Sequence, residues 1–383
     1  MIRILITTLL ILFFLESNSQ SCLPNGITFR TQSEIDSFPV NYPSCNVILG
    51  NVGVFGGNSV TNLLGLSQIH TIEGTLTIDS NRLLTNLQGL NQLSVVGGSL
   101  IIGTYHNSGN AALADISALG NLNSVGAQIF IGYNPVLLSL NGLEGISAIT
   151  EDLYIWGNPS LTDFSGLDNL TSIGGRFDCD ENGITTFSGL ENLNHIGAYL
   201  KINNNNSLLN LNALYGLTFV GNELIIYHND TLTSLKGLDS INGNAITKLT
   251  IYENYYLSDC AVQSICNYLT GSGNSVIQFN YEGCKTTDQV KAACALLSDE
   301  IKEFPSFSIF PNPVIDHFTL KIPKKGPYKN FALHNLYGTE ILSVSISDFE
   351  TDIYLGHLPT GLYFGIIRGT DYLKILKIQI INT

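Results

Sequence analysis

Charged residues are scarce in this sequence, and basic residues are the scarcest. Only 13% of the 383 residues are charged, and 17 basic residues against 31 acidic ones give a net charge of −14. Nucleic-acid binding needs clustered positive charge, so this balance argues against it. Hydrophobic residues make up 44% of the chain, which is too many for a disordered protein. The composition therefore predicts a packed protein that has an acidic surface and binds no nucleic acid.

Long apolar runs are also missing, apart from one at the N-terminus. Residues 1–19 read as a signal peptide, with Arg3 before an apolar run at residues 4–15 and small residues at 17–19. No other stretch approaches 18 apolar residues, so we expect no transmembrane segment in the mature protein. Lipid attachment at Cys22 is an alternative, although the preceding Ser-Gln-Ser matches a lipobox poorly. Either way, the sequence predicts export.

Catalytic motifs are absent. The sequence contains no Gly-x-Ser-x-Gly, no His-Glu-x-x-His and no P-loop. Its seven His residues are scattered, and none forms a metal-ligand pair with another. We therefore expect no enzyme activity, no cofactor and no metal site.

What the sequence does contain is an internal repeat, and residues 152–175 are its cleanest copy. The counterparts of Leu153 are 23 to 29 residues apart and are Leu76, Leu100, Ile129, Phe177, Leu200, Leu224 and Leu249. A period this constant predicts a solenoid of stacked coils. The third coil carries an insertion at about residues 104–110, and insertions of this kind are either part of a binding face or neutral.

Each repeat reads as a short strand followed by a turn. Leu153 and Ile155 alternate with outward residues, which predicts a strand with one apolar face. Asn158 follows, and it recurs as Asn81, Asn134, Asn182, Asn229 and Asn254. Stacking would place these amides in a hydrogen-bonded ladder. The repeat closes on Gly174-Gly175, where we expect a positive φ. A single coil cannot bury its apolar side, but several stacked coils can.

The pattern Leu-x-Ile-x-x-Asn-x-x-Leu-x-x-Leu-x-Gly-Leu-x-x-Leu-x-x-Ile-Gly-Gly resembles receptor L-domain leucine-rich repeats. The variant here is similar to that of surface proteins from Bacteroidetes-type bacteria. The resemblance covers residues 47–257 and implies a right-handed β-helix with a long parallel sheet along one side. The expected fold class is mainly β, with short helical caps at both ends of a β-solenoid.

Six cysteines flank this region and are the candidates for disulfides. In the N-terminal cap, residues 20–46, a capping box at Thr31–Glu34 predicts a helix from Gln32, with Cys22 and Cys45 on either side. Export favours a disulfide between these two cysteines. Cys179 occupies a core position of its strand, so we expect it to be buried and unpaired.

A second cap is predicted at residues 258–298, a region that also resembles the C-terminal cap of the repeat family. A helix starting at Ser258 or Asp259 would separate Cys260 and Cys266 by about 9 Å along its axis, too far for them to pair with each other. Their expected partners are Cys284 and Cys294, and the pairing stays open. Zinc is an alternative for four cysteines, but the sequence has no Cys-x-x-Cys pair.

After a polar linker at residues 299–306, the tail at residues 307–383 alternates strands with Pro/Gly turns. This predicts a small antiparallel β-sandwich. The tail resembles the type A C-terminal sorting domain of the type IX secretion system. The residues that carry this resemblance are Pro311, Asn312, Pro313, Gly338, Gly361, Lys374 and Lys377. It implies contact with that secretion machinery, removal of the tail, and a secreted or outer-membrane cell-surface location. An ordinary β-sandwich binding module is the alternative.

The outward face of the predicted parallel sheet is the candidate binding surface. With coils about 4.8 Å apart, strand alternation would expose an aromatic strip with polar neighbours. Its members are Phe130, Tyr154, Trp156, Asp178, Asp180, Tyr199, Tyr227 and Tyr252. Such a face suits sugar rings or an extended protein, although these residues are also simply good strand formers.

The sequence thus predicts an exported repeat protein that binds a glycan or protein, as in adhesion. Two alternatives stay open. One is a carbohydrate-active enzyme in which Asp178 and Asp180 act as paired carboxylates. The other is a purely structural component of a surface layer.

Overall fold

A computed structural model shows a mainly β protein, with 34% of residues in strands and 13% in helices. It describes residues 20–104, 109–271, 273–300, 307–322, 328–336, 339–346, 350–356, 358–369 and 373–381. The predicted signal peptide (1–19) and Gly338 lie outside these residues, as do most of the predicted linker and the centre of the predicted insertion. The chain forms two compact units, residues 1–297 and 298–383.

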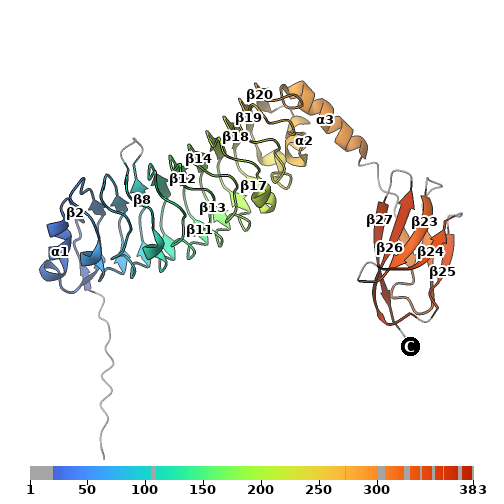
Figure 1. The fold of residues 1–383 in the computed structure, drawn as a ribbon, viewed down its shortest axis with the longest axis horizontal. Helices are drawn as coiled ribbons and strands as arrows, with labels where there is room; N and C mark the ends of the chain where they lie inside the picture. Colours follow the sequence, from blue (N-terminus) through green and yellow to red (C-terminus); the bar gives the residue numbers. More distant parts are fainter. Residues whose placement is uncertain are drawn as a thin grey trace, which may run out of the picture. The chain divides into compact units, whose positions relative to one another are not determined.

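The first unit is built around an 11-stranded sheet whose strands follow one another in chain order and pair in parallel (Figure 1). Its strands are β2 (Ile27–Phe29), β4 (Val52–Val54), β6 (Leu76–Ile78), β8 (Leu100–Gly103), β10 (Ile129–Gly132), β12 (Leu153–Trp156), β14 (Phe177–Asp180), β16 (Leu200–Asn203), β18 (Glu223–Tyr227), β19 (Lys248–Tyr252) and β20 (Asn274–Gln278). Leu153 is in register with Ile129 and Phe177, its counterparts in the sequence repeat. We call this sheet the long sheet, and one repeat a coil.

The coils up to β18 return through a short strand on the other side of the unit (Figure 1). One short sheet contains β1 (Gln20–Cys22), β3 (Cys45–Ile48), β5 (Thr71–Ile72), β7 (Val95–Val96) and β9 (Ser124–Val125), and the other contains β11 (Ala148–Ile149), β13 (Ser172–Ile173), β15 (His195–Ile196) and β17 (Phe219–Val220). Short 3₁₀ helices lie in some connections, namely η1 (Leu64–Leu66), η2 (Ser117–Leu119), η3 (Asn212–Gly216) and η4 (Gly243–Ala245). Leucines and isoleucines from every coil join in one continuous buried core between the sheets.

A ladder of buried asparagines joins the coils at the end of the long sheet. Asn158 is typical: its backbone N–H lies 3.2 Å from Oδ1 of Asn182, and its Nδ2 donates to the carbonyls of Ile131 and Trp156. The ladder comprises Asn81, Asn110, Asn134, Asn158, Asn182, Asn205, Asn229, Asn254 and Asn280. The predicted ladder is confirmed, and it also contains Asn110, Asn205 and Asn280, which the repeat pattern did not reveal.

The residue before each ladder asparagine adopts a left-handed conformation in most coils. These residues, which we call the turn column, are Ser80, Tyr133, Gly157, Glu181, Asn204, His228, Glu253 and Phe279. Side chains are uncommon at positive φ, because their Cβ crowds the backbone. The turn must be held by the ladder that follows it, and it aims the column's side chains away from the core.

Glycines close the coils for a different reason from the one predicted. Gly174 and Gly175 do not have positive φ. A Cβ on Gly174 would lie 2.1 Å from the carbonyl oxygen of Thr150 in the preceding coil. The same overlap would occur at Gly97, Gly126, Gly197 and Gly221. These positions need glycine because neighbouring backbones approach too closely for any side chain.

The N-terminal cap contains α1 (Gln32–Asn41), whose capping box between Thr31 and Glu34 is present as predicted. A disulfide joins Cys22 to Cys45, which confirms that expectation. Ile35 and Phe38 of α1 are buried against the first coils. The helix therefore covers the open end of the core.

The C-terminal cap differs from the prediction at both of its helices. α2 (Gln263–Leu269) begins after Val262, because Asp259 pairs with Ser234 of the preceding coil and does not cap the helix. α3 (Thr287–Glu300) was not predicted, and its end extends into the predicted linker. Disulfides join Cys260 to Cys284 and Cys266 to Cys294, which resolves the open pairing.

The second unit consists of two antiparallel sheets that share one apolar core, the arrangement of a small β-sandwich. One sheet contains β21 (Ser308–Phe310), β22 (His317–Lys321) and β25 (Glu350–Tyr354), and the other contains β23 (Tyr328–His334), β24 (Glu340–Ser345), β26 (Gly361–Gly369) and β27 (Leu373–Ile380). Phe318 and Phe331 meet edge to face in the core. Within the described residues of the whole chain, no helix has the length and apolar character needed to cross a membrane.

Candidate functional site

Two columns of side chains run along the outer face of the long sheet. Because each strand is in register with the next, equivalent residues line up across the coils, about 4.8 Å apart. The first column contains Phe130, Tyr154, Asp178, Lys201, Ile225 and Thr250. The second contains Gly132, Trp156, Asp180, Asn203, Tyr227 and Tyr252. The sequence predicted that most of these side chains lie together, but Tyr199, which was predicted to join them, comes just before β16 and belongs to neither column.

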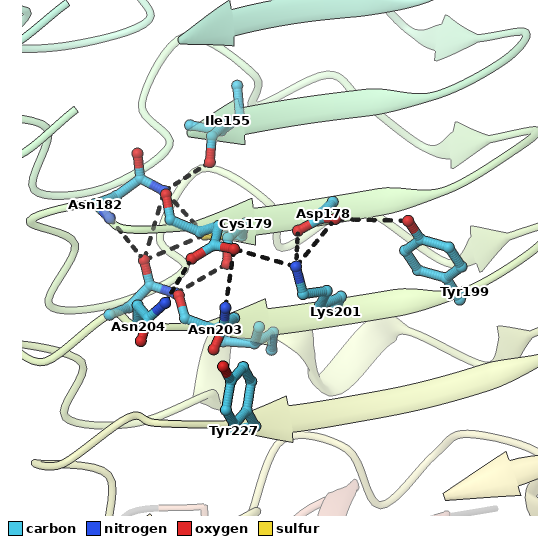
Figure 2. A network of polar contacts seen from close by, with 12 residues as sticks. Ile155, Asp178, Cys179, Asn182, Tyr199, Lys201, Asn203, Asn204 and Tyr227 are labelled. Carbon is cyan, nitrogen blue, oxygen red and sulfur yellow. Dashed lines mark hydrogen bonds and ion pairs between the residues drawn. The ribbon is translucent and has the colours of Figure 1, made fainter. Parts of the chain in front are cut away.

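Lys201 is the centre of a polar network in these columns (Figure 2). Its Nζ lies 3.4 Å from Oδ1 of Asp178 and 3.1 Å from Oδ2 of Asp180. The side-chain amides of Asn203 and Asn204 donate to Asp180 at 2.8 and 3.1 Å. Both carboxylates are thus engaged by protein donors, which fixes the geometry of the middle of the face.

An aromatic cluster flanks the network on its N-terminal side. The ring of Trp156 lies 5.8 Å from that of Phe130 and 5.4 Å from that of Tyr154, both edge to face. We expected all three side chains to be exposed, but Phe130 is fully buried and Tyr154 is only 8% exposed. Large rings on adjacent strands cover one another, and the ring of Phe130 also lies over Gly132, which has no side chain. Trp156 alone stays partly open to solvent.

A second aromatic cluster flanks the network on its C-terminal side. The ring of Tyr252 lies 6.4 Å from that of Tyr227 and 5.3 Å from that of Phe279. Phe279 is 58% exposed and was not predicted, because it belongs to the turn column beyond the last regular repeat. Recognition of Asn280 as a ladder residue would have revealed it. Figure 2 shows Tyr227 directly beside Asn203, so this cluster continues the polar network.

Asp178 and Tyr199 were also expected to be exposed. Asp178 is only 3% exposed, and burial raises its pKa, while the nearby Lys201 opposes the rise and Asp180 adds to it. Tyr199 is partly exposed, and its hydroxyl lies 3.5 Å from Oδ2 of Asp178. Its ring also stacks under the guanidinium of Arg176, 5.3 Å from the ring centroid. Tyr199 and Lys201 therefore cover the carboxylate that the sequence placed at the surface.

The raised pKa of Asp178 predicts how the stability of the protein depends on pH. The folded chain holds this proton more tightly than the unfolded chain, whose pKa is near 3.8. The contribution of Asp178 to stability is therefore greatest below that value and falls as pH rises through the raised pKa. We expect the free energy of unfolding of the wild type, relative to that of Asp178→Asn, to fall as pH rises above about 3.8 and through the raised pKa of Asp178. Urea unfolding of both proteins at several pH values tests this, and a difference independent of pH would contradict it.

Cys179 is free and fully buried, as predicted. Burial raises the pKa of its thiol, which disfavours the reactive thiolate. Its sulfur contacts the ladder residues Asn182 and Asn205. Cys179 thus has the position of a core residue. Among the described residues, no three His, Cys, Asp or Glu side chains are grouped as a metal site would require.

The side chain of Asn312 ties the Pro311-Asn312-Pro313 segment at the start of the second unit to β27. Its Nδ2 donates to the carbonyl of Lys377, and its Oδ1 accepts from the backbone N–H of Gln379, both at 3.0 Å. The side chain therefore pairs with β27 in the way that a strand backbone would. Gly361 begins β26. Lys374 lies in β27.

The second unit is the part of the chain that comparison with known proteins identifies. Residues 308–382 match the family described as the secretion system C-terminal sorting domain. The match indicates export through the type IX secretion system of Bacteroidetes and interaction with that machinery, and it points to a secreted or cell-surface protein. A comparison with curated proteins found no match.

Proposed function

We propose that the exported protein acts in adhesion or ligand capture, and that it binds a glycan or protein on the outer face of its long sheet. The observation that carries this proposal is the arrangement of that face. Two aromatic clusters flank a fixed polar network in one register, with Trp156 on one side and Tyr227 and Tyr252 on the other. Aromatic rings with ordered polar groups between them suit sugar rings and extended chains.

We infer that the first unit is a leucine-rich solenoid of the receptor L-domain type. The coil length, the parallel register, the continuous leucine core and the asparagine ladder support this inference. Each coil alone leaves one apolar side uncovered, so the stack is stable only as a whole. A rigid stack presents its outer side chains at fixed spacing, which suits a ligand with a repeating structure.

The same geometry favours a role without catalysis. Paired carboxylates that act as acid and base need access to substrate. Asp178 is buried, and both carboxylates share the ammonium group of Lys201. Asp180 is further held by two side-chain amides. This network is better suited to positioning hydrogen-bonding groups than to proton transfer.

Removal of one partly exposed ring from each aromatic cluster tests the proposal. We expect the double variant Trp156→Ala, Tyr227→Ala to lose binding on a glycan array and on an array of extracellular proteins, because both stacking surfaces are truncated. The matched control is Tyr215→Ala in η3, which is 64% exposed and lies outside the long sheet.

The double variant should keep the circular-dichroism spectrum of the wild type. Unchanged binding by the folded double variant would exclude the outer face. Self-association without any ligand would instead favour a structural surface-layer component.

A further inference from the structure

A groove of about 310 Å³ lies beside the second column, at the turns that follow β10, β12 and β14. It is lined by Tyr133, Pro135, Gly157, Pro159 and Glu181. Tyr133, Gly157 and Glu181 belong to the turn column, so the left-handed turns that support the ladder also shape this groove. None of these residues was singled out in the sequence.

The floor of the groove is apolar and held in place by the backbone. The ring of Tyr133 lies over Gly157, where a Cβ would be 2.7 Å from the ring. Pro135 and Pro159 occupy equivalent positions after their ladder asparagines, and both are exposed. The hydroxyl of Ser160 donates to the carbonyl of Pro135 at 2.7 Å and ties the two coils together. Few side-chain torsions need to be fixed when a ligand binds here.

The wall of the groove is acidic. Glu181 is exposed, and within the described part of the chain its carboxylate has no ion-pair partner. Asp180 pairs with the ammonium group of Lys201, which is shared with Asp178. The pKa of Tyr133 is raised by burial and then by the charges of Glu181 and Asp180, so the negative potential reaches the groove. A cation is the complementary ligand group.

We infer that this groove binds the side chain of a lysine from a partner protein. The four methylene groups would lie on the ring of Tyr133 and on the two prolines, and the ammonium group would meet Glu181. The inference rests on the proposed binding function, because the groove continues the second column beyond Trp156 and Asp180. An amino sugar carries a similar cation but has no flexible apolar stem to cover the prolines.

Fluorescence anisotropy with a labelled tetralysine peptide tests the inference on the full chain at about 0.15 M salt, where long-range attraction is screened. We expect saturable binding of tetralysine and loss of binding when its side chains are acetylated. Glu181→Gln should weaken binding about fivefold, the effect of losing one exposed ion pair beside an aromatic ring. The matched control is Glu73→Gln, which removes an equal charge from an exposed side chain after β5.

Equal effects of Glu181→Gln and Glu73→Gln would overturn the inference, because the peptide would then sense only the overall negative charge. Equally tight binding of a glucosamine tetramer would overturn the choice of lysine and assign the groove to amino sugars. Tyr227→Ala should leave tetralysine binding unchanged while it weakens binding on the arrays. Failure of the lysine inference and failure of the proposed function are therefore distinguishable. Tetralysine binding tests the groove, and array binding tests the outer face of the long sheet.

Discussion

Asn182→Ala is expected to lower the free energy of unfolding by about 3–5 kcal/mol, because it leaves several buried groups without partners. The side chain of Asn182 donates to the carbonyls of Ile155 and Asp180, at 2.7 and 3.0 Å. Its Oδ1 accepts from both the backbone and the side-chain amide of Asn158. Alanine can replace none of these bonds, and Asn182 is only 5% exposed. Urea unfolding followed by circular dichroism measures the loss.

The matched control is Asn206→Ala. Asn206 is exposed and follows Asn205, the ladder residue of the next coil. The control substitution therefore deletes the same side-chain amide at a position where that amide faces solvent. We expect a change within about 0.5 kcal/mol for the control. Equal losses in the two variants would show that the ladder does not hold the coils together.

Gly197→Ala is the second substitution with a large expected effect. A Cβ at residue 197 would lie 2.0 Å from the carbonyl oxygen of Gly174 in the preceding coil. The backbone cannot yield without separating two coils along their shared core and ladder. We expect a loss of about 2–4 kcal/mol, as for other overpacked positions, and loss of the sharp unfolding transition as the stack divides at this point. Urea unfolding with hydrogen exchange of the flanking coils checks both effects.

Gly120→Ala is the control for this substitution. Gly120 has ordinary helical φ of −59°, and a Cβ there would meet only the carbonyl oxygen of Ser117 at 3.4 Å. We expect alanine to be neutral or to stabilise the protein by about 0.5 kcal/mol. If Gly197→Ala were as harmless, the coils would be less closely stacked than the structure shows.

Much of the long sheet could be predicted from the sequence, because its side chains repeat with the coil. The position of Leu153 in the repeat gave the register of its neighbours, and Asn158 gave the ladder. Alternation along the strand placed Trp156 and Asp180 in one outward column. Because the repeat length is nearly constant, equivalent residues of successive repeats lie next to each other on adjacent coils.

The solvent exposure of the outward-facing side chains could not be predicted in the same way. Alternation tells which face a side chain points to, but not what lies over it there. Phe130 and Asp178 point outward and are still buried, one under neighbouring rings and the other under Lys201 and Tyr199. Phe279 was missed because the repeat pattern changes at the cap while the ladder continues. The groove beside Glu181 depends on turn conformations that no pattern of residue types shows.

Hydroxyl-radical footprinting tests the central claim, that the outer face of the long sheet is the ligand-binding surface. The ligand that gives the strongest signal on the arrays would be added to the full chain, and oxidation of aromatic side chains compared with and without it. We predict that Trp156, Tyr227 and Tyr252 become protected while Tyr215 in η3 does not. Protection of Tyr215 with unchanged oxidation along the long sheet would contradict the account.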